Sequence, residues 1–200
     1  MSAESGPEAE PGSDPAGATS AAAPASAIGP VGPAGPASKP GPSSPLGPAF
    51  PAGDPQQIVV VGDWHGNEAW ALSVIRRVPG LLAGQPRRLI LHLGDFGIWP
   101  DAAGQAYLAH VSAALAAIDA ELWFIDGNHE DFPQLDRLAR EGGMTPDGRV
   151  EVRPRLYHLP RGYRWTWHGR RWLACGGGVS LDRAERTEGV DWWPEEEITD

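Results

Sequence analysis

The stretch that decides the fold is residues 57–67, which read QIVVVGDWHGN. Its β-branched run ends in a glycine, which is typical of a strand buried in a sheet. Two similar runs, at residues 88–93 and 121–125, also lead into glycine and polar side chains. Helices are predicted between these strands, at residues 67–78 and 101–120, since apolar residues or alanines recur there at helical spacing. Strands that alternate with helices indicate an α/β fold with a parallel sheet covered on both faces.

The chain downstream of the third strand has a different pattern. A short helix is predicted at residues 132–140, and three alternating segments after Pro154 are predicted to form a meander of antiparallel strands that starts a second sheet. These segments are residues 155–159, 163–168 and 171–175. We interpret the tryptophans that alternate within them as core residues, with a base-stacking platform as the alternative. Three glutamates after Pro194 predict the start of a helix, whose N-terminal dipole favours acidic side chains.

The first part of the chain differs in composition from the rest. Residues 1–56 are mostly Pro, Gly, Ala and Ser with one aromatic residue, whereas all nine tryptophans and all three tyrosines lie beyond them. So little apolar surface cannot offset the entropy of ordering a chain. We therefore expect a disordered leader over residues 1–56 and a folded domain over residues 57–200.

Composition also excludes several classes of function. The net charge is −10, of which five acids and one lysine in the leader contribute −4 and the domain −6. An acidic domain lacks the basic field that drives nucleic-acid binding, so nucleic acid is not the expected partner. A single cysteine rules out an internal disulfide and a thiolate zinc site. Without a signal-peptide pattern or an apolar run of about 20 residues, we expect a cytoplasmic protein that does not enter a membrane.

Side chains that can bind a metal ion follow each of the three predicted strands. Asp63 and His65 follow the first strand, Asp95 the second, and Asn128 and His129 the third. Ligands bind outside the carboxyl ends of the strands in an α/β sheet, so we expect these side chains to converge. An extended Asp-x-His segment would point both of its side chains the same way. A mixed set of oxygen and nitrogen donors suits Mn²⁺, Fe²⁺ or Zn²⁺ better than Ca²⁺ or Mg²⁺.

These donors would allow two-metal chemistry. Two ions about 3.5–4 Å apart could share Asp95, generate a hydroxide near neutral pH and clamp a phosphoryl group. Each motif alone has a simpler explanation, because Gly-Asp and Gly-Asn pairs are also common in turns. Their order, each at a strand end, favours the metal site. The glycines at 176–178 lack the pattern of a phosphate-binding loop. The remaining histidines are interpreted as structural or surface residues: His92, His110, His158 and His168.

The same motifs resemble those of a known family. GDWHGN at residues 62–67, GD at 94–95 and GNHE at 127–130 are similar to the first three motifs of the calcineurin-like metallophosphoesterase superfamily. The resemblance begins at Ile58 and covers the rest of the chain. Its later part is similar to bacterial members of unknown substrate through GGGVSLD at 176–182, Arg186 and WWPEEE at 192–197.

The resemblance implies a role for each strand-end residue. Asp63 and His65 would bind the first metal ion, Asp95 would bridge two ions, and Asn128 would bind the second. His129 would stand over the leaving-group oxygen as an acid or charge stabiliser. The implied fold is a sandwich of two mixed sheets flanked by helices. The implied reaction is hydrolysis of phosphomonoesters or phosphodiesters by a hydroxide that bridges the two divalent ions, on a small-molecule or phosphoprotein substrate.

Two departures from the family pattern matter. Where the family often has a second aspartate, three residues after the bridging one, this chain has Ile98. The sequence also contains no Gly-His-x-His, which supplies the family's closing ligands, so we expect the C-terminal part of the domain to be missing. The second ion would then have Asp95 and Asn128 alone, and we expect hydrolysis to be weak or absent. The alternative is a catalytically inactive metal-binding or regulatory module on the same fold.

Overall fold

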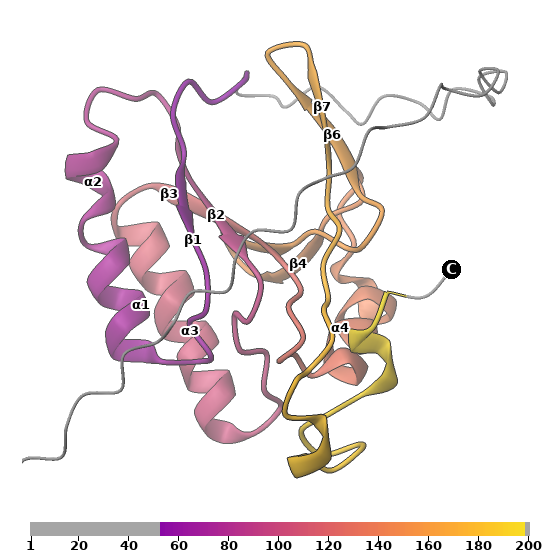
Figure 1. Ribbon diagram of the computed structural model, residues 1–200. Coiled ribbons are helices and arrows are strands. Elements are labelled where there is room, and N and C mark those ends of the chain that lie inside the picture. The colour runs from indigo at the N-terminus through magenta and orange to yellow at the C-terminus, as the bar shows by residue number, and fades with distance from the viewer. Residues whose placement is uncertain (1–52, 199–200) are drawn as a thin grey trace, which may run out of the picture. The chain divides into compact units, whose positions relative to one another are not determined.

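The computed structural model describes residues 53–198, so most of the expected leader, residues 1–52, lies outside the described residues. The mixed α/β architecture consists of a five-stranded sheet, a β6-β7 hairpin and flanking helices (Figure 1). The strands are β1 (Val59–Val61), β2 (Arg88–Leu93), β3 (Ala120–Ile125), β4 (Val150–Arg153), β5 (Leu156–His158), β6 (Arg164–Trp167) and β7 (Arg170–Leu173). The helices are α1 (Glu68–Ile75), α2 (Val78–Leu81), α3 (Ala102–Ala117) and α4 (Phe132–Leu138), with a π-helical turn (Ala139–Gly143) and two 3₁₀ turns (Arg183–Glu185 and Pro194–Glu196).

The five-stranded sheet has the order β1-β2-β3-β5-β4. The strands β1, β2, β3 and β5 run parallel to one another, and β4 runs antiparallel to β5. Side-chain caps start the helices that connect the strands, since Asn67, Asp101 and Asp131 each accept a hydrogen bond from a first-turn backbone amide of α1, α3 and α4. The predicted α/β class is confirmed, and the carboxyl ends of β1, β2 and β3 lie side by side.

The segment after Pro154 departs from the predicted meander. Residues 156–158 form β5, which joins the main sheet parallel to β3, and the antiparallel second sheet consists of β6 and β7. β4 is not among the predicted strands. The prediction was wrong because the deciding contact is not local: Leu122 pairs with Leu156, and no short pattern around either residue encodes that pairing.

The main sheet is covered on both faces, by helices on one side and by the hairpin on the other (Figure 1). Ile90 of β2 belongs to a core shared with α1 and α3, whereas its neighbour Leu91 belongs to a second core shared with the hairpin. Trp165 and Trp167 are 3% and 4% exposed in this second core, which confirms their interpretation as core residues. Trp172 differs, because it stacks on Trp165 but remains 40% exposed.

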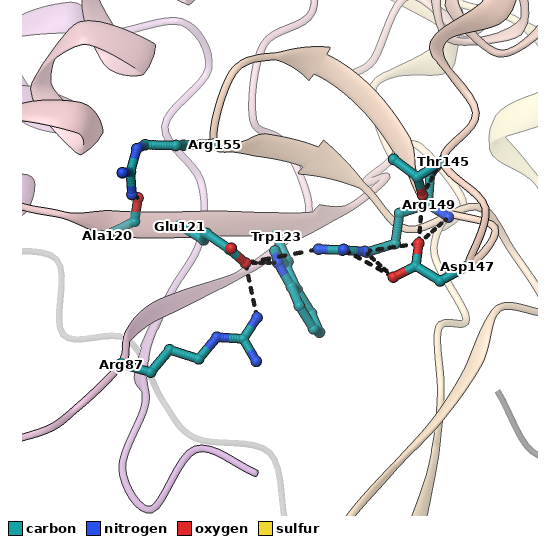
Figure 2. Close-up of polar contacts among 8 residues, drawn as sticks. All are labelled: Arg87, Ala120, Glu121, Trp123, Thr145, Asp147, Arg149 and Arg155. Atoms are coloured by element: carbon teal, nitrogen blue, oxygen red, sulfur yellow. Dashed lines mark hydrogen bonds and ion pairs between the residues drawn. The ribbon is translucent and has the colours of Figure 1, made fainter. Parts of the chain in front are cut away.

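A polar cluster around Trp123 borders the second core (Figure 2). The Arg87 guanidinium donates to Glu121 Oε2 at 2.8 Å, and Trp123 Nε1 donates to the same oxygen at 3.0 Å. Arg149 lies over the Trp123 ring at 4.7 Å from its centroid and pairs with Asp147 at 2.8 Å. Arg87 precedes β2 and Glu121 lies near the start of β3, so this cluster stabilises the end of the sheet opposite the sequence motifs.

Residues 53–56 precede the expected start of the domain, and the Asp54 carboxylate accepts a hydrogen bond from the His168 amide at 2.7 Å, in the turn between β6 and β7. Among the described residues, no helix is both long enough and apolar enough to cross a membrane.

His92 of β2 is fully buried on the helix side of the sheet. Neither ring nitrogen has a hydrogen-bond partner among residues 53–198. The ring makes edge contacts with Trp64 and Phe96, at centroid distances of 4.8 and 5.2 Å. Burial lowers the pKa of His92 to about 3, and the nearby His65 acts in the same direction. The histidine is therefore a neutral core residue, as interpreted from the sequence.

A neutral buried histidine makes the fold sensitive to acid. The unfolded chain takes up a proton on His92 below about pH 6.5, whereas the folded chain does so only near pH 3, so stability falls as the pH drops through that window. At pH 5 this loss is about 2 kcal/mol. His92→Phe should remove this loss of stability. Urea unfolding at pH 7.5 and at pH 5 gives the difference in unfolding free energy that measures it. An unchanged difference in His92→Phe would contradict the prediction.

Candidate metal centre

The loops after β1 and β2 run beside each other and continue the pairing of the two strands. The Asp63 amide donates to the Gly94 carbonyl at 3.1 Å, and the His65 amide donates to the Asp95 carbonyl at 2.7 Å. Gly97 lies against Gly66 so closely that a Cβ on Gly97 would stand 2.2 Å from the Gly66 nitrogen. The backbone of the two loops therefore places the side chains of both motifs next to each other.

Three predicted ligands converge at this point. Side-chain donor atoms of Asp63, His65 and Asp95 all lie within 4.8 Å of one another, and His65 Nε2 is 3.7 Å from Asp95 Oδ2. A cation held at about 2.0–2.2 Å from each donor would allow a separation of at most about 4.4 Å. Shifts of a few tenths of an ångström would close the group around an ion, so these residues fit a divalent metal.

The backbone at these residues is unusual. Asp63, His65 and Asp95 have φ angles of 57°, 48° and 58°, which is the left-handed region that residues other than glycine rarely adopt. The expectation that Asp63 and His65 point the same way along an extended segment was wrong, because β1 ends at Val61. The side chains converge through left-handed turns instead. Backbone strain of this kind concentrates at functional sites.

The described part of the chain places no arginine in an ion pair with the group. Asp63 and Asp95 carry its two carboxylates. Asp95 is 8% exposed, so its charge is largely removed from solvent. Asp63 and His65 are exposed, so a divalent cation could reach both carboxylates and the imidazole from solvent.

The turn after β3 holds Asp95 from the other side. The His129 amide donates to Asp95 Oδ1 at 2.9 Å. A Cβ on Gly127 would stand 1.9 Å from that same oxygen, so any larger residue would displace the carboxylate. A Cβ on Gly94 would stand 3.0 Å from the Cα atom of Gly127. The glycines allow the second and third motifs to pack against each other.

A comparison with known protein families agrees with a metal-binding role for these residues. The model of the calcineurin-like phosphoesterase family matches residues 57–199. The chain belongs to this family. Calcineurin-like phosphoesterases are metal-dependent hydrolases of phosphoesters. Neither the curated proteins nor the solved structures contain a match to the chain.

Within this phosphoesterase domain, Glu130 supports the loop that follows Asp95. Its carboxylate is fully buried and accepts hydrogen bonds from three successive amides, those of Phe96 at 2.6 Å, Gly97 at 3.1 Å and Ile98 at 3.2 Å. Burial raises the pKa of Glu130 to about 8, although the three amide hydrogen bonds oppose this shift. Glu130 belongs to the GNHE motif at residues 127–130, but no role was predicted for it from the sequence.

Asn128 is connected to the C-terminal segment. Its Nδ2 atom donates to Ser180 Oγ at 2.9 Å, and Ser180 donates from both its amide and its hydroxyl to the carboxylate of Glu196, each at 2.9 Å. The Asn128 carbonyl oxygen, which a cation would take, is not used in this network. The predicted helix start after Pro194 is only a 3₁₀ turn. Glu196 is fully buried there and binds Ser180, so its role is not to complement a helix dipole.

His129 stands at the border of the group. Its ring is 5.1 Å from the His65 ring between centroids, with the planes nearly perpendicular. Arg186 Nη2 lies 2.7 Å from His129 Nε2 and also contacts Nδ1. Because a guanidinium carries only donors, at least one ring nitrogen of His129 acts as an acceptor in this arrangement. Arg186 lies in the later part of the sequence that resembles the family, but no role was predicted for it from the sequence.

The remaining residues singled out in the sequence do not belong to the metal-binding group. His110 pairs with Glu68 at 2.8 Å, and His158 contacts Asp126 at 3.2 Å in a buried position. Ile98, which stands where the family often has an aspartate, is fully buried in the core. No histidine other than His65 belongs to the Asp/His group found among the described residues.

Proposed function

We propose that this chain binds divalent transition-metal ions and hydrolyses phosphoesters weakly. The observation that carries the proposal is the convergence of Asp63, His65 and Asp95 from two strand ends, each with left-handed backbone. Asp63 and His65 would hold the first ion, Asp95 would be shared, and Asn128 would contribute its carbonyl oxygen to a second. Mn²⁺, Fe²⁺ and Zn²⁺ suit this mixture of donors.

The chemistry divides between the ions and the protein. A bound divalent ion acts as a Lewis acid on the phosphoryl oxygen and makes a water nucleophilic near neutral pH. The Asp95 carboxylate is held in position to bind an ion, because its Oδ1 accepts a hydrogen bond from the His129 amide while its Oδ2 faces His65. His129 would give a proton to the leaving-group oxygen or stabilise its charge, since an imidazole can serve either purpose near neutral pH.

The alternative function is a module that binds metal without turnover. The described residues contain one group of three or more Asp, Glu, His or Cys side chains that could hold an ion. That group provides a first ion with three ligands and leaves the second with Asp95 and Asn128. Catalysis by two ions depends on preorganised charge, so a loosely held second ion would contribute little.

Hydrolysis of bis-p-nitrophenyl phosphate tests the proposal. With added Mn²⁺, the 200-residue chain should show weak turnover, well below the range of about 1–1000 s⁻¹ that is usual for enzymes. EDTA and His129→Ala should abolish it, whereas His110→Ala, at an exposed histidine outside the centre, should not change it. Metal binding without any turnover would favour the inactive module. Turnover within the usual enzyme range would contradict the expected shortage of ligands for the second ion.

A further inference from the structure

A hollow of about 550 Å³ lies beside the candidate centre. The residues that line it are Leu181, Arg183, Ala184, Arg186, Glu188 and Trp192. Two arginines and one glutamate give these lining residues a net charge of +1, in a chain whose net charge is −10. The hollow therefore presents two arginines, although Arg186 is already paired with Asp182, so Arg183 is the cation to consider for a ligand.

Arg186 connects this hollow to the centre. Its Nη2 contacts His129, its Nε pairs with Asp182 Oδ2 at 2.9 Å, and its Nη1 donates to the Asp191 carbonyl at 3.0 Å. These three anchors hold the guanidinium in one position. A phosphoester bound at Asp63, His65 and Asp95 would therefore have Arg186, and the hollow behind it, on its His129 side.

Arg183 is the cation of the hollow that has no acidic partner among residues 53–198. Its guanidinium carbon lies 3.9 Å from the centroid of the Trp192 ring, and Trp192 is only 4% exposed. Stacking on a buried aromatic ring uses the face of the guanidinium and leaves its in-plane N–H donors for a ligand. A planar fork of this kind matches the oxygens of a carboxylate or phosphate.

We propose that the hollow is a leaving-group subsite that binds a second anionic group of the substrate through Arg183. The substrates would then be phosphoesters whose leaving group carries a carboxylate or another phosphate, on the side that His129 faces. Glu188, which also lines the hollow, would make a singly charged group, such as a carboxylate, the better fit of the two. This inference rests on the proposed function, because it requires the phosphoryl group to bind at the metal centre.

Binding of two non-hydrolysable ligands tests the subsite without turnover. Phenylphosphonate and 4-carboxyphenylphosphonate differ only in the second anionic group, and both can be titrated calorimetrically into the Mn²⁺-loaded chain. The carboxylate should tighten binding about fivefold, the upper part of the range for exposed ion pairs. Arg183→Gln should reduce that preference to within twofold while leaving the phenylphosphonate affinity unchanged. Arg171→Gln, at an exposed arginine on β7, should retain the full preference.

The possible outcomes separate the subsite from the metal centre. A wild-type chain without the carboxylate preference, or an Arg183→Gln chain that keeps it, would overturn the subsite. Failure to bind 4-carboxyphenylphosphonate at millimolar concentration would overturn it as well. Phenylphosphonate binding that is the same with and without Mn²⁺ would overturn the metal centre, and with it the position of a leaving-group subsite. A carboxylate preference that Arg183→Gln still removes would in that case show Arg183 as an anion-binding residue only.

Discussion

Asp95→Ala should weaken Mn²⁺ or Zn²⁺ binding by at least about 100-fold, since the loss of a direct ligand exceeds the 10–100-fold cost of losing an outer partner. Asp95 is central to the group: its Oδ2 faces His65, and its Oδ1 is held by the turn after β3. Its carboxylate is also the expected shared ligand of two ions. Isothermal titration of the metal-free chain measures the effect directly.

The control for this variant is another aspartate with the same backbone conformation. Asp119 has a φ angle of 51°, close to the 58° of Asp95, but it is exposed and pairs with Arg155 away from the centre. Asp119→Ala therefore introduces a similar backbone strain without removing a ligand. It should bind metal like the wild type. Equal metal affinity in Asp95→Ala and Asp119→Ala would disprove the ligand assignment.

Glu130→Ala should strongly destabilise the fold. It leaves three successive buried amides, those of residues 96–98, without an acceptor. Each unsatisfied buried donor costs about 1–3 kcal/mol. We expect a loss of about 3–5 kcal/mol in the free energy of unfolding, a large part of the stability of a typical domain. Urea unfolding monitored by tryptophan fluorescence measures it.

Two further variants show whether the carboxylate is the cause. Glu130→Gln keeps one acceptor oxygen but turns an amide group toward backbone donors, so its loss of stability should be intermediate. Glu151→Ala, at an exposed glutamate on β4, should change stability by no more than about 0.5 kcal/mol. If Glu130→Ala were as stable as Glu151→Ala, the three amide hydrogen bonds would not hold the loop after Asp95.

Much of the candidate site follows from local sequence. A short apolar run that leads into glycine and a polar residue is readable within six to eight residues, and this pattern precedes Asp63, Asp95 and Asn128. Parallel strands place their carboxyl ends together, so convergence of the motifs follows from the fold class. The placement of Trp165 and Trp167 in a core follows from their alternation in the same way.

Other features depend on contacts that no local pattern contains. β5 pairs with β3 in the main sheet, although the segment around it alternates like the hairpin that follows. Asp63 and His65 meet through left-handed turns, because hydrogen bonds to the loop after β2 hold their backbone. Glu130 reaches amides more than 30 residues away along the chain. Such contacts form only once the strands have paired.

The sequence by itself determined which strand ends carry donors and which family these motifs resemble, because both are properties of short segments. The tertiary structure alone decided what surrounds the donors. It brought Arg186 to His129 across 57 residues and Ser180 to Asn128 across 52 residues. It also left Asp63 and Asp95 without an arginine partner in the described part of the chain. Charge balance and hydrogen bonding around a site depend on which segments meet in space, and that is settled by the packing of the whole domain.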